Sequence, residues 1–268
     1  AGGANGGAAG PIGGGSSAGQ AGGGSGAGQA GSGPAPCVDS STYPGGGFYK
    51  ADISEVSGMT LNGNAASRAG ILRLAPASPG GGGNAFWDTP LSISSATSVF
   101  AHFSLRISGG EGTLGGDGLA FVLQNAGPAV VGRAGGGLGY GDIGDTVAIK
   151  LDSYFNQETD PADNLIGLTV NDPDFYLAYT AAPFEINDNV RRYVWISIDS
   201  PAALLEVFVS ETPTQPSSPI LTYPAFRISN QLSEETYVGF TAASGEAHND
   251  HDLLGEAWIV TSALGRCR

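Results

Sequence analysis

The sequence predicts an all-β protein whose strands form a two-layer sandwich, preceded by an extended Gly-rich segment. Short apolar runs alternate with clusters of turn residues from Cys37 to the end of the chain. No window shows the 3.6-residue apolar period of an amphipathic helix, and Gly contributes 45 residues while only 13% are charged. A sandwich of two antiparallel sheets is the usual way in which such strands bury their apolar faces.

The individual strands are expected where apolar and β-branched residues gather between Pro- and Gly-rich breaks, such as residues 76–83 and 213–219. The expected strands are 99–107, 118–123, 145–152, 193–199, 204–209, 237–242 and 258–260.

The segment 1–36 differs in composition from the rest of the chain. It holds 16 Gly and 9 Ala, no charged or aromatic residue, and Ile12 as its one larger aliphatic side chain. Such a segment cannot bury enough apolar surface to offset the entropy of ordering. We therefore expect a domain at 37–268 with residues 1–36 as a flexible arm or linker, or alternatively as an assembly element ordered by neighbouring copies.

Cys37 and Cys267 bracket the whole predicted domain. Two free buried thiols are one interpretation, and a disulfide that joins the domain ends is the other and preferred one. Closing so long a loop stabilises by roughly 3–5 kcal/mol in the chain-entropy model. A Cys37–Cys267 disulfide would require an oxidising compartment, hence a secreted or extracellular surface location.

Charge and hydropathy argue against two classes of partner. The formal charge is -14, from 25 acidic and 11 basic side chains, and such a chain repels a phosphate backbone. No stretch approaches the ~20 apolar residues that cross a bilayer, so neither nucleic acid nor membrane insertion is expected. The chain starts without Met or a leader, as a processed chain would, and its acidity and Gly content favour a bacterial secreted or surface protein.

The segment 145–161 carries the most informative polar residues. On an extended chain Lys150, Asp152, Tyr154 and Asn156 point to one face. Two carboxylates, an amide and main-chain oxygens close together are ligands that a calcium ion prefers. Loops rich in Asp and Asn also occur as ordinary turns, so this spacing alone leaves both interpretations open.

The run Val-Ala-Ile-Lys-Leu-Asp-Ser-Tyr-Phe-Asn at 147–156 resembles the metal-binding strand of L-type (legume-like) lectins, whose usual form is Val-Ala-Val-Glu-Phe-Asp-Thr-Tyr-x-Asn. Further matching blocks lie in family order at 61–65, 71–74, 116–123, 135–139, 166–171, 194–196, 237–245 and 251–254. The resemblance covers about residues 47–262. It implies a concanavalin-like jelly-roll sandwich and a calcium-dependent, carbohydrate-binding domain of a bacterial-type member.

The resemblance also implies roles for individual residues around one calcium ion. Asp152 and Asp160 match the carboxylates that bind calcium, Asn156 matches the amide ligand, and Tyr154 matches the residue that offers its main-chain oxygen.

A carbohydrate site is implied beside this calcium ion. Asp117 matches the aspartate that grips the sugar, preceded in the family by a cis peptide bond. With Asn156 and a backbone N–H of Gly136 or Gly137, it would bind vicinal hydroxyls, while the Tyr154 ring would cover the apolar face of a hexose. Asp117 as a plain turn residue and Tyr154 as ordinary strand packing are the alternatives.

Two departures from the family pattern concern a second, transition metal. The family uses Glu where this chain has Lys150 and His where it has Leu165, so this second metal is expected to be absent. The Lys150 ammonium would then act as an internal counter-ion that faces Asp152 and Asp160.

Two other function classes were weighed. Sandwich glucanases carry Glu-x-Asp-x-(x)-Glu on one strand, and this string does not occur here, so we expect no enzyme. The second class is the structural subunit of an extracellular fibre or pilus-like assembly, with subunit contacts made by residues 1–36. A lectin on an assembling arm would be a multivalent adhesin, so these two interpretations are compatible.

Overall fold

A computed structural model describes residues 47–110 and 115–262 of the chain. They belong to one compact unit that spans residues 32–268. The predicted arm at 1–36 and both cysteines of the expected Cys37–Cys267 disulfide lie outside the described residues, so these expectations stay predictions.

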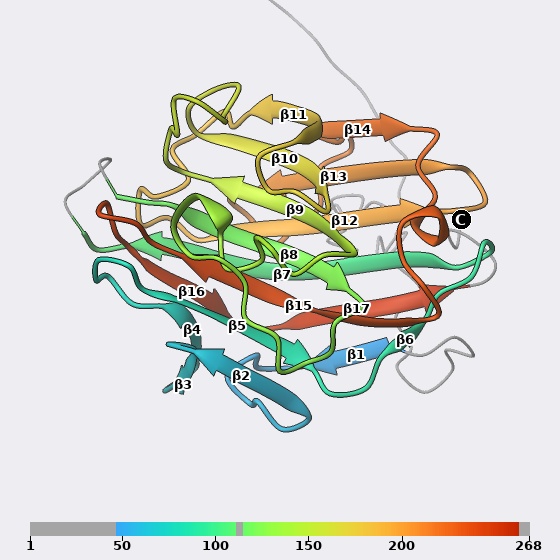
Figure 1. Cartoon of the computed structure of the whole chain (residues 1–268), viewed down its shortest axis with the longest axis horizontal. Coiled ribbons are helices and arrows are strands. Elements are labelled where there is room, and N and C mark those ends of the chain that lie inside the picture. Colours follow the sequence, from blue (N-terminus) through green and yellow to red (C-terminus); the bar gives the residue numbers. More distant parts are fainter. Residues whose placement is uncertain (1–46, 111–114, 263–268) are drawn as a thin grey trace, which may run out of the picture. The chain divides into compact units, whose positions relative to one another are not determined.

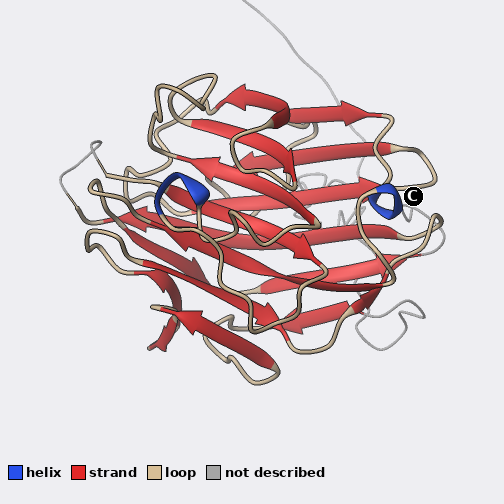
Figure 2. Ribbon diagram, viewed as in Figure 1, coloured by secondary structure: helices blue, strands red, loops and turns tan. Residues whose placement is uncertain are grey.

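The described residues form two antiparallel sheets, which confirms the predicted sandwich (Figures 1 and 2). The first sheet has nine strands, in the order β14 (Leu221–Pro224), β13 (Leu204–Ser210), β12 (Arg192–Asp199), β7 (Ser98–Ser108), β16 (Asp250–Leu254), β4 (Ile71–Ala75) and β3 (Ala66–Arg68). Two more strands complete it, because β17 (Ala257–Ser262) also pairs with β7, and β1 (Gly47–Lys50) pairs with β17.

The second sheet has eight strands and lies in front in the view of Figure 1. Its order is β11 (Tyr176–Ala181), β10 (Leu165–Val170), β9 (Thr146–Asp152), β8 (Gly118–Gln124), β15 (Glu235–Ala243), β5 (Gly82–Trp87) and β2 (Met59–Gly63), and β6 (Leu91–Ser92) pairs with β15. Two short 3-10 turns, η2 (Gly135–Gly137) and η3 (Ile228–Asn230), are the helical elements among the described residues.

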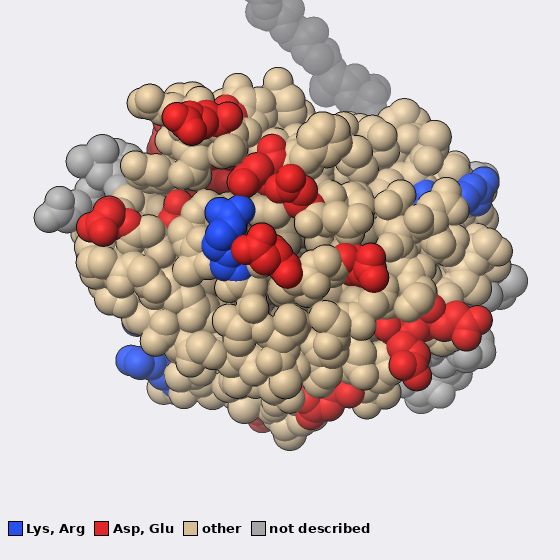
Figure 3. Space-filling model, viewed as in Figure 1, with Lys and Arg blue, Asp and Glu red and all other residues tan. Residues whose placement is uncertain are grey.

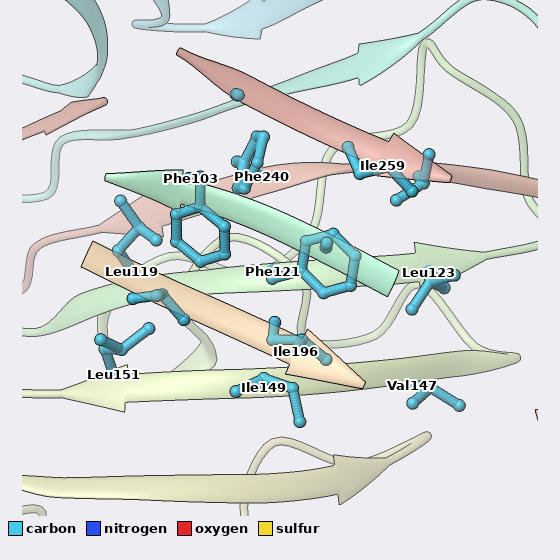
Figure 4. Close-up of a cluster of buried hydrophobic side chains, with 14 of the residues drawn as sticks. Phe103, Leu119, Phe121, Leu123, Val147, Ile149, Leu151, Ile196, Phe240 and Ile259 are labelled. Carbon is cyan, nitrogen blue, oxygen red and sulfur yellow. The ribbon is translucent and has the colours of Figure 1, made fainter. Parts of the chain in front are cut away.

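The core fills the space between the sheets because alternate side chains of each strand point inward. Phe103 of β7 meets Phe240 of β15 edge to face at 4.8 Å and stacks on Phe121 of β8 at 6.1 Å (Figure 4). Burying these aromatic and aliphatic side chains is the main stabilising contribution to such a fold.

The structure differs from the sequence prediction at the end of β9. The sequence predicts an extended strand through Asn156. In the structure the strand ends at Asp152 and the chain bends at Tyr154. The reason is local, because the Asp152 carboxylate accepts the Tyr154 N–H at 3.2 Å and thereby turns the chain. Asn156 is consequently part of a turn, and its main-chain oxygen accepts the N–H groups of Thr159 and Asp160.

Strands β10 and β11 were not among the strands expected from the sequence, although residues 166–171 were one of the blocks that resemble the family. β10 is buried along nearly its whole length, so its side chains show no alternation of polarity, and β11 is a half-exposed edge strand with small residues. Their pairing with β9 nevertheless decides what lies beside the predicted calcium segment.

One face of the molecule is acidic, in keeping with the composition. Acidic side chains are spread over the face drawn in Figure 3, where basic side chains are few. Among the described residues no helix has the length and apolar character needed to span a bilayer.

Candidate carbohydrate and calcium site

The residues predicted to bind sugar come together where β8 begins, β9 ends and β15 ends. The Gly116–Asp117 peptide bond is cis, as the resemblance implied. The Asp117 N–H donates to the Ala243 oxygen at 2.9 Å, and its carbonyl accepts the Ser153 N–H at 2.9 Å. These bonds join the start of β8 to the ends of the strands on both sides of it, so the position of Asp117 is set by three strands.

The Asp117 side chain is nearly buried, with 3% of the residue exposed. Its Oδ2 atom accepts no hydrogen bond from any described residue. Burial raises the pKa of this carboxyl to about 6, although the Gly245 backbone N–H and the Asn156 side chain act in the opposite direction. An acceptor that is buried without a partner is costly unless a ligand supplies the donor.

The Gly-rich loop that carries η2 lies against Asn156. A Cβ atom added at Gly136 would lie 3.1 Å from Asn156 Nδ2, so glycine lets this loop approach the amide closely. The N–H of Gly137, proposed as an alternative sugar donor, donates within the loop to the Ala134 oxygen at 3.3 Å. Of the two glycines, Gly136 is therefore the one that the structure places at the site.

Tyr154 lies at the bend that follows β9 and is 40% exposed. Its side chain packs on Gly116, where an added Cβ would lie 2.8 Å from the Tyr154 Cβ. The ring is thus held beside the cis peptide with part of its surface open to a ligand. A half-exposed aromatic ring next to buried polar groups is the usual composition of a sugar site.

The four predicted calcium ligands lie in one tight turn. The Asn156 N–H donates to Asp160 Oδ2 at 2.7 Å, and the Tyr154 N–H donates to Asp152 Oδ1 at 3.2 Å. Both carboxylates are buried. The turn therefore gathers carboxylate, amide and main-chain oxygens without nitrogen or sulfur donors, which is the donor set that suits calcium.

Two of the four predicted calcium ligands, Asp152 and Asp160, are acidic side chains. Within residues 47–110 and 115–262, no group of three or more His, Cys, Asp or Glu residues could hold a metal ion. Burial, together with the nearby Asp160 carboxylate, raises the pKa of Asp152 to about 7 against the attraction of Lys150. Two buried carboxylates and one ammonium leave a net negative charge, so the residues present fit one divalent cation. Its ligands would be Asp152, Asp160, Asn156 and the Tyr154 carbonyl.

Lys150 lies under this turn with its ammonium directed at the acids. Its Nζ lies 2.9 Å from Asp152 Oδ2 and 3.8 Å from Asp160 Oδ1. Both the lysine and the two carboxylate side chains are 1% exposed. The geometry is the one expected of an internal counter-ion. Leu165, the other departure from the family pattern, is buried at the start of β10 opposite Asp152.

Tyr176 is a site residue that sequence reasoning missed. Its hydroxyl accepts from Lys150 Nζ at 2.6 Å and donates to Asp160 Oδ1 at 2.7 Å. The available signal was the register, because Tyr176 pairs with Thr169 and Thr169 with Ala148, two residues before Lys150 on the same face of β9. Only a correct prediction of β10 and β11 would have revealed it.

Comparison with known proteins identifies the family. The legume lectin domain model matches residues 46–263. The leucoagglutinating phytohemagglutinin of Phaseolus vulgaris is 30% identical over 216 residues, which cover 76% of this chain and 73% of that protein. The L-type lectin-domain containing receptor kinase V.9 of Arabidopsis thaliana is 27% identical over 69% of this chain, and the chain spans about a third of that kinase's length (31%).

Among solved structures, the lectin from Bauhinia forficata in complex with GalNAc has the same fold. It superimposes with a TM-score of 0.69 and 19% identity, covering 82% of this chain and all (100%) of that one. The predictions of a sandwich fold and of a carbohydrate-binding module rather than an enzyme agree with these relationships. The chain belongs to the legume lectin domain family.

Proposed function

We propose that this domain binds carbohydrate in a calcium-dependent manner, at the site formed by Asp117, Asn156, Gly136 and Tyr154. The observation that carries the proposal is the Asp117 carboxylate, which is buried with Oδ2 unpartnered among the described residues while the half-exposed Tyr154 ring lies nearby. A sugar hydroxyl would satisfy Oδ2, and the apolar face of the sugar would cover the ring.

The roles of the polar groups follow from their donor and acceptor capacity. The Asp117 carboxylate only accepts, and the Asn156 amide both donates and accepts, so together they can hold two neighbouring hydroxyls. The Gly136 backbone would supply a further N–H. A sugar that lacks one of these hydroxyls would leave a buried group unpaired, which is how such sites discriminate between sugars.

Calcium would serve this site as a structural ion. Bound by Asp152, Asp160, Asn156 and the Tyr154 carbonyl, a divalent cation would neutralise the buried carboxylates and hold the turn that presents Asn156. Oxygen ligands from a single turn, with burial of both acids, support this assignment.

The direct experiment is binding of the full chain to an array of immobilised glycans, with and without EDTA, followed by titration with GalNAc and galactose. We expect binding that EDTA abolishes and added CaCl2 restores, and that Asp117→Ala removes without a loss of secondary structure. Binding that survives both EDTA and Asp117→Ala would show that this site is not responsible.

We further propose a secreted or cell-surface location, bacterial in origin, with residues 1–36 as a tether or as an arm for self-assembly. The uncharged Gly and Ala composition of this segment supports such a role. Sedimentation of the full chain and of a chain that begins at Cys37 distinguishes the two forms. If the full chain assembles and the shortened chain does not, residues 1–36 form the arm of a multivalent adhesin. If both chains sediment as monomers, residues 1–36 are a tether.

A further inference from the structure

The Lys150 ammonium has a complete set of partners from the protein itself. Its three N–H groups have three acceptors close by, namely Asp152 Oδ2 at 2.9 Å, the Pro173 carbonyl at 3.0 Å and the Tyr176 hydroxyl at 2.6 Å. The hydroxyl in turn donates to Asp160 Oδ1 at 2.7 Å. Buried polar networks of this kind are stable when every donor is used.

Each carboxylate of the turn divides its two oxygens between different partners. Asp152 Oδ2 accepts from the Lys150 ammonium, and Asp152 Oδ1 accepts from the Tyr154 N–H. Asp160 Oδ1 accepts from the Tyr176 hydroxyl, and Asp160 Oδ2 accepts from the Asn156 N–H. One oxygen of each acid is thus held by the side chains of Lys150 and Tyr176, while the other holds the backbone of the turn.

We infer that Lys150 and Tyr176 form a clamp made only of protein, which replaces a second metal ion, and that Tyr176 is a positioning residue for the carbohydrate site. This inference rests on the proposed function for its consequence in sugar binding, but the clamp itself is tested without sugar. We refer to these two side chains as the Lys–Tyr clamp.

The charges explain why one divalent cation suffices. The ammonium and the two carboxylates sum to one negative charge, and a single divalent ion changes this to one positive charge. A second divalent ion beside Nζ would meet a fixed positive charge at short range in a buried site, where repulsion is poorly screened. It would also find one oxygen of each acid already bonded to the clamp.

The clamp reaches the sugar site through the backbone of the turn. Tyr176 orients Asp160, Asp160 holds the Asn156 N–H, and the Asn156 side chain lies against Gly136 of the proposed carbohydrate site. Loss of the Tyr176 hydroxyl should therefore loosen Asn156 even though the ring stays in place over Gly167, whose added Cβ would lie 2.6 Å from that ring.

The first test is metal stoichiometry of the full chain, stripped with EDTA and titrated with Ca²⁺ and with Mn²⁺ by calorimetry and elemental analysis. We expect one equivalent of Ca²⁺ and no additional equivalent of Mn²⁺. In Lys150→Glu, a third carboxylate replaces the ammonium, and a second divalent ion should bind. A second equivalent in the wild-type chain, or none gained by a folded Lys150→Glu variant, would overturn the inference.

The second test uses amide hydrogen exchange of the calcium-free chain, which needs neither sugar nor a charge substitution. Tyr176→Phe should speed exchange of the Asn156 and Asp160 amides at least fivefold and leave exchange in the centres of β8 and β9 unchanged. The control is Tyr179→Phe, because Tyr179 lies on the same strand, 6.0 Å from the Tyr176 ring, and is half exposed. Unchanged Asn156 exchange, or a uniform increase through the sheet, would refute a positioning role for Tyr176. If both tests succeed and the glycan array shows no binding, the proposed function fails while the clamp stands.

Discussion

The Asp117 carbonyl accepts two hydrogen bonds from Ser153, one from the N–H at 2.9 Å and one from the hydroxyl at 3.2 Å. Asp117 directly precedes β8, and Ser153 directly follows β9, in the turn that contains the candidate calcium ligands. The two halves of the site are therefore joined directly, and a displacement of the turn would shift Asp117, the residue proposed to bind sugar.

The first prediction concerns the charge of Asp117. Because its folded-state pKa is about 6, the carboxylate becomes protonated as the pH falls through this value and loses part of its capacity to accept hydrogen bonds from sugar hydroxyls. At saturating calcium, we expect sugar affinity to fall between pH 7 and pH 5 by at most about tenfold, because a nearby divalent cation favours the ionised carboxylate and lowers its pKa. Titration calorimetry at several pH values measures this, and equal affinity at pH 5 and 7 would contradict it.

Stability should respond to Asp117 in the opposite direction. Its folded pKa lies above the unfolded value of 3.8, so the cost of the buried charge is fully present above pH 6 and disappears as the pH falls toward 3.8. Asp117→Asn should remove sugar binding yet stabilise the calcium-free fold at pH 7, by up to about 3 kcal/mol. Urea unfolding at pH 7 tests this.

The second prediction concerns the Tyr154 ring. Tyr154→Ala should weaken sugar binding about tenfold, a loss of about 1.4 kcal/mol, because the apolar sugar face loses its stacking partner. Tyr154→Phe should keep most of the affinity. Phe155→Ala is the matched control, since Phe155 is the next residue and equally exposed, at 41% against 40%. An equal loss in both alanine variants would assign the effect to the loop rather than to stacking.

The third prediction uses the close approach of Gly136 to Asn156. The added Cβ of Gly136→Ala would lie 3.1 Å from Asn156 Nδ2, so the amide must shift and sugar affinity should fall at least fivefold with little change in Tm. Gly82→Ala serves as the control, because its nearest contact would be an ordinary 3.4 Å to the Ala134 Cβ. If Gly136→Ala leaves the sugar affinity unchanged, the loop that carries η2 does not take part in sugar binding.

The fourth prediction concerns His251, a fully buried residue of β16. Burial lowers its pKa from 6.5 to about 4, although Asp252 opposes this shift. The unfolded chain therefore binds a proton that the folded chain does not, and His251 should cost about 3 kcal/mol of stability as the pH falls from 6.5 to 4. In His251→Gln this part of the pH dependence should be missing from urea unfolding curves. Parallel curves for both chains would show that His251 titrates normally.

The fifth prediction concerns the ion pair between Arg73 and Asp252. Arg73 binds both Asp252 oxygens, at 2.7 and 3.0 Å, and the Asp252 side chain is 0% exposed. Asp252→Ala should destabilise the fold by about 3 kcal/mol because Arg73 and Arg106 both lose this buried partner, while Asp250 still pairs with Arg73 at 2.7 Å. The double variant Arg73→Met with Asp252→Leu should recover much of this loss in chemical unfolding. Additive losses would show that the two side chains act independently.

Part of the site was predictable because its ligands are close in sequence. Asp152, Tyr154, Asn156 and Asp160 lie within nine residues, so their proximity follows from the sequence alone, although the turn that local hydrogen bonds form after Asp152 was not predicted. Lys150 could be placed beside Asp152 because residues two apart on a strand share a face. The resemblance to lectins then added Asp117, which no local pattern would have connected to the turn.

Sequence by itself determined the strands with clear alternation, the acidic composition and the oxygen-rich segment after β9, since each depends on the side chains of neighbouring residues. Tertiary structure alone decided that Tyr176 completes the network of Lys150, that Gly136 lies against Asn156, and that Asp117 Oδ2 is left without a partner among the described residues. The physical reason is that these relationships depend on which strands pair and in which register. The two-residue alternation of side chains specifies which residues share a face of a strand, but it does not specify which other strand pairs with it.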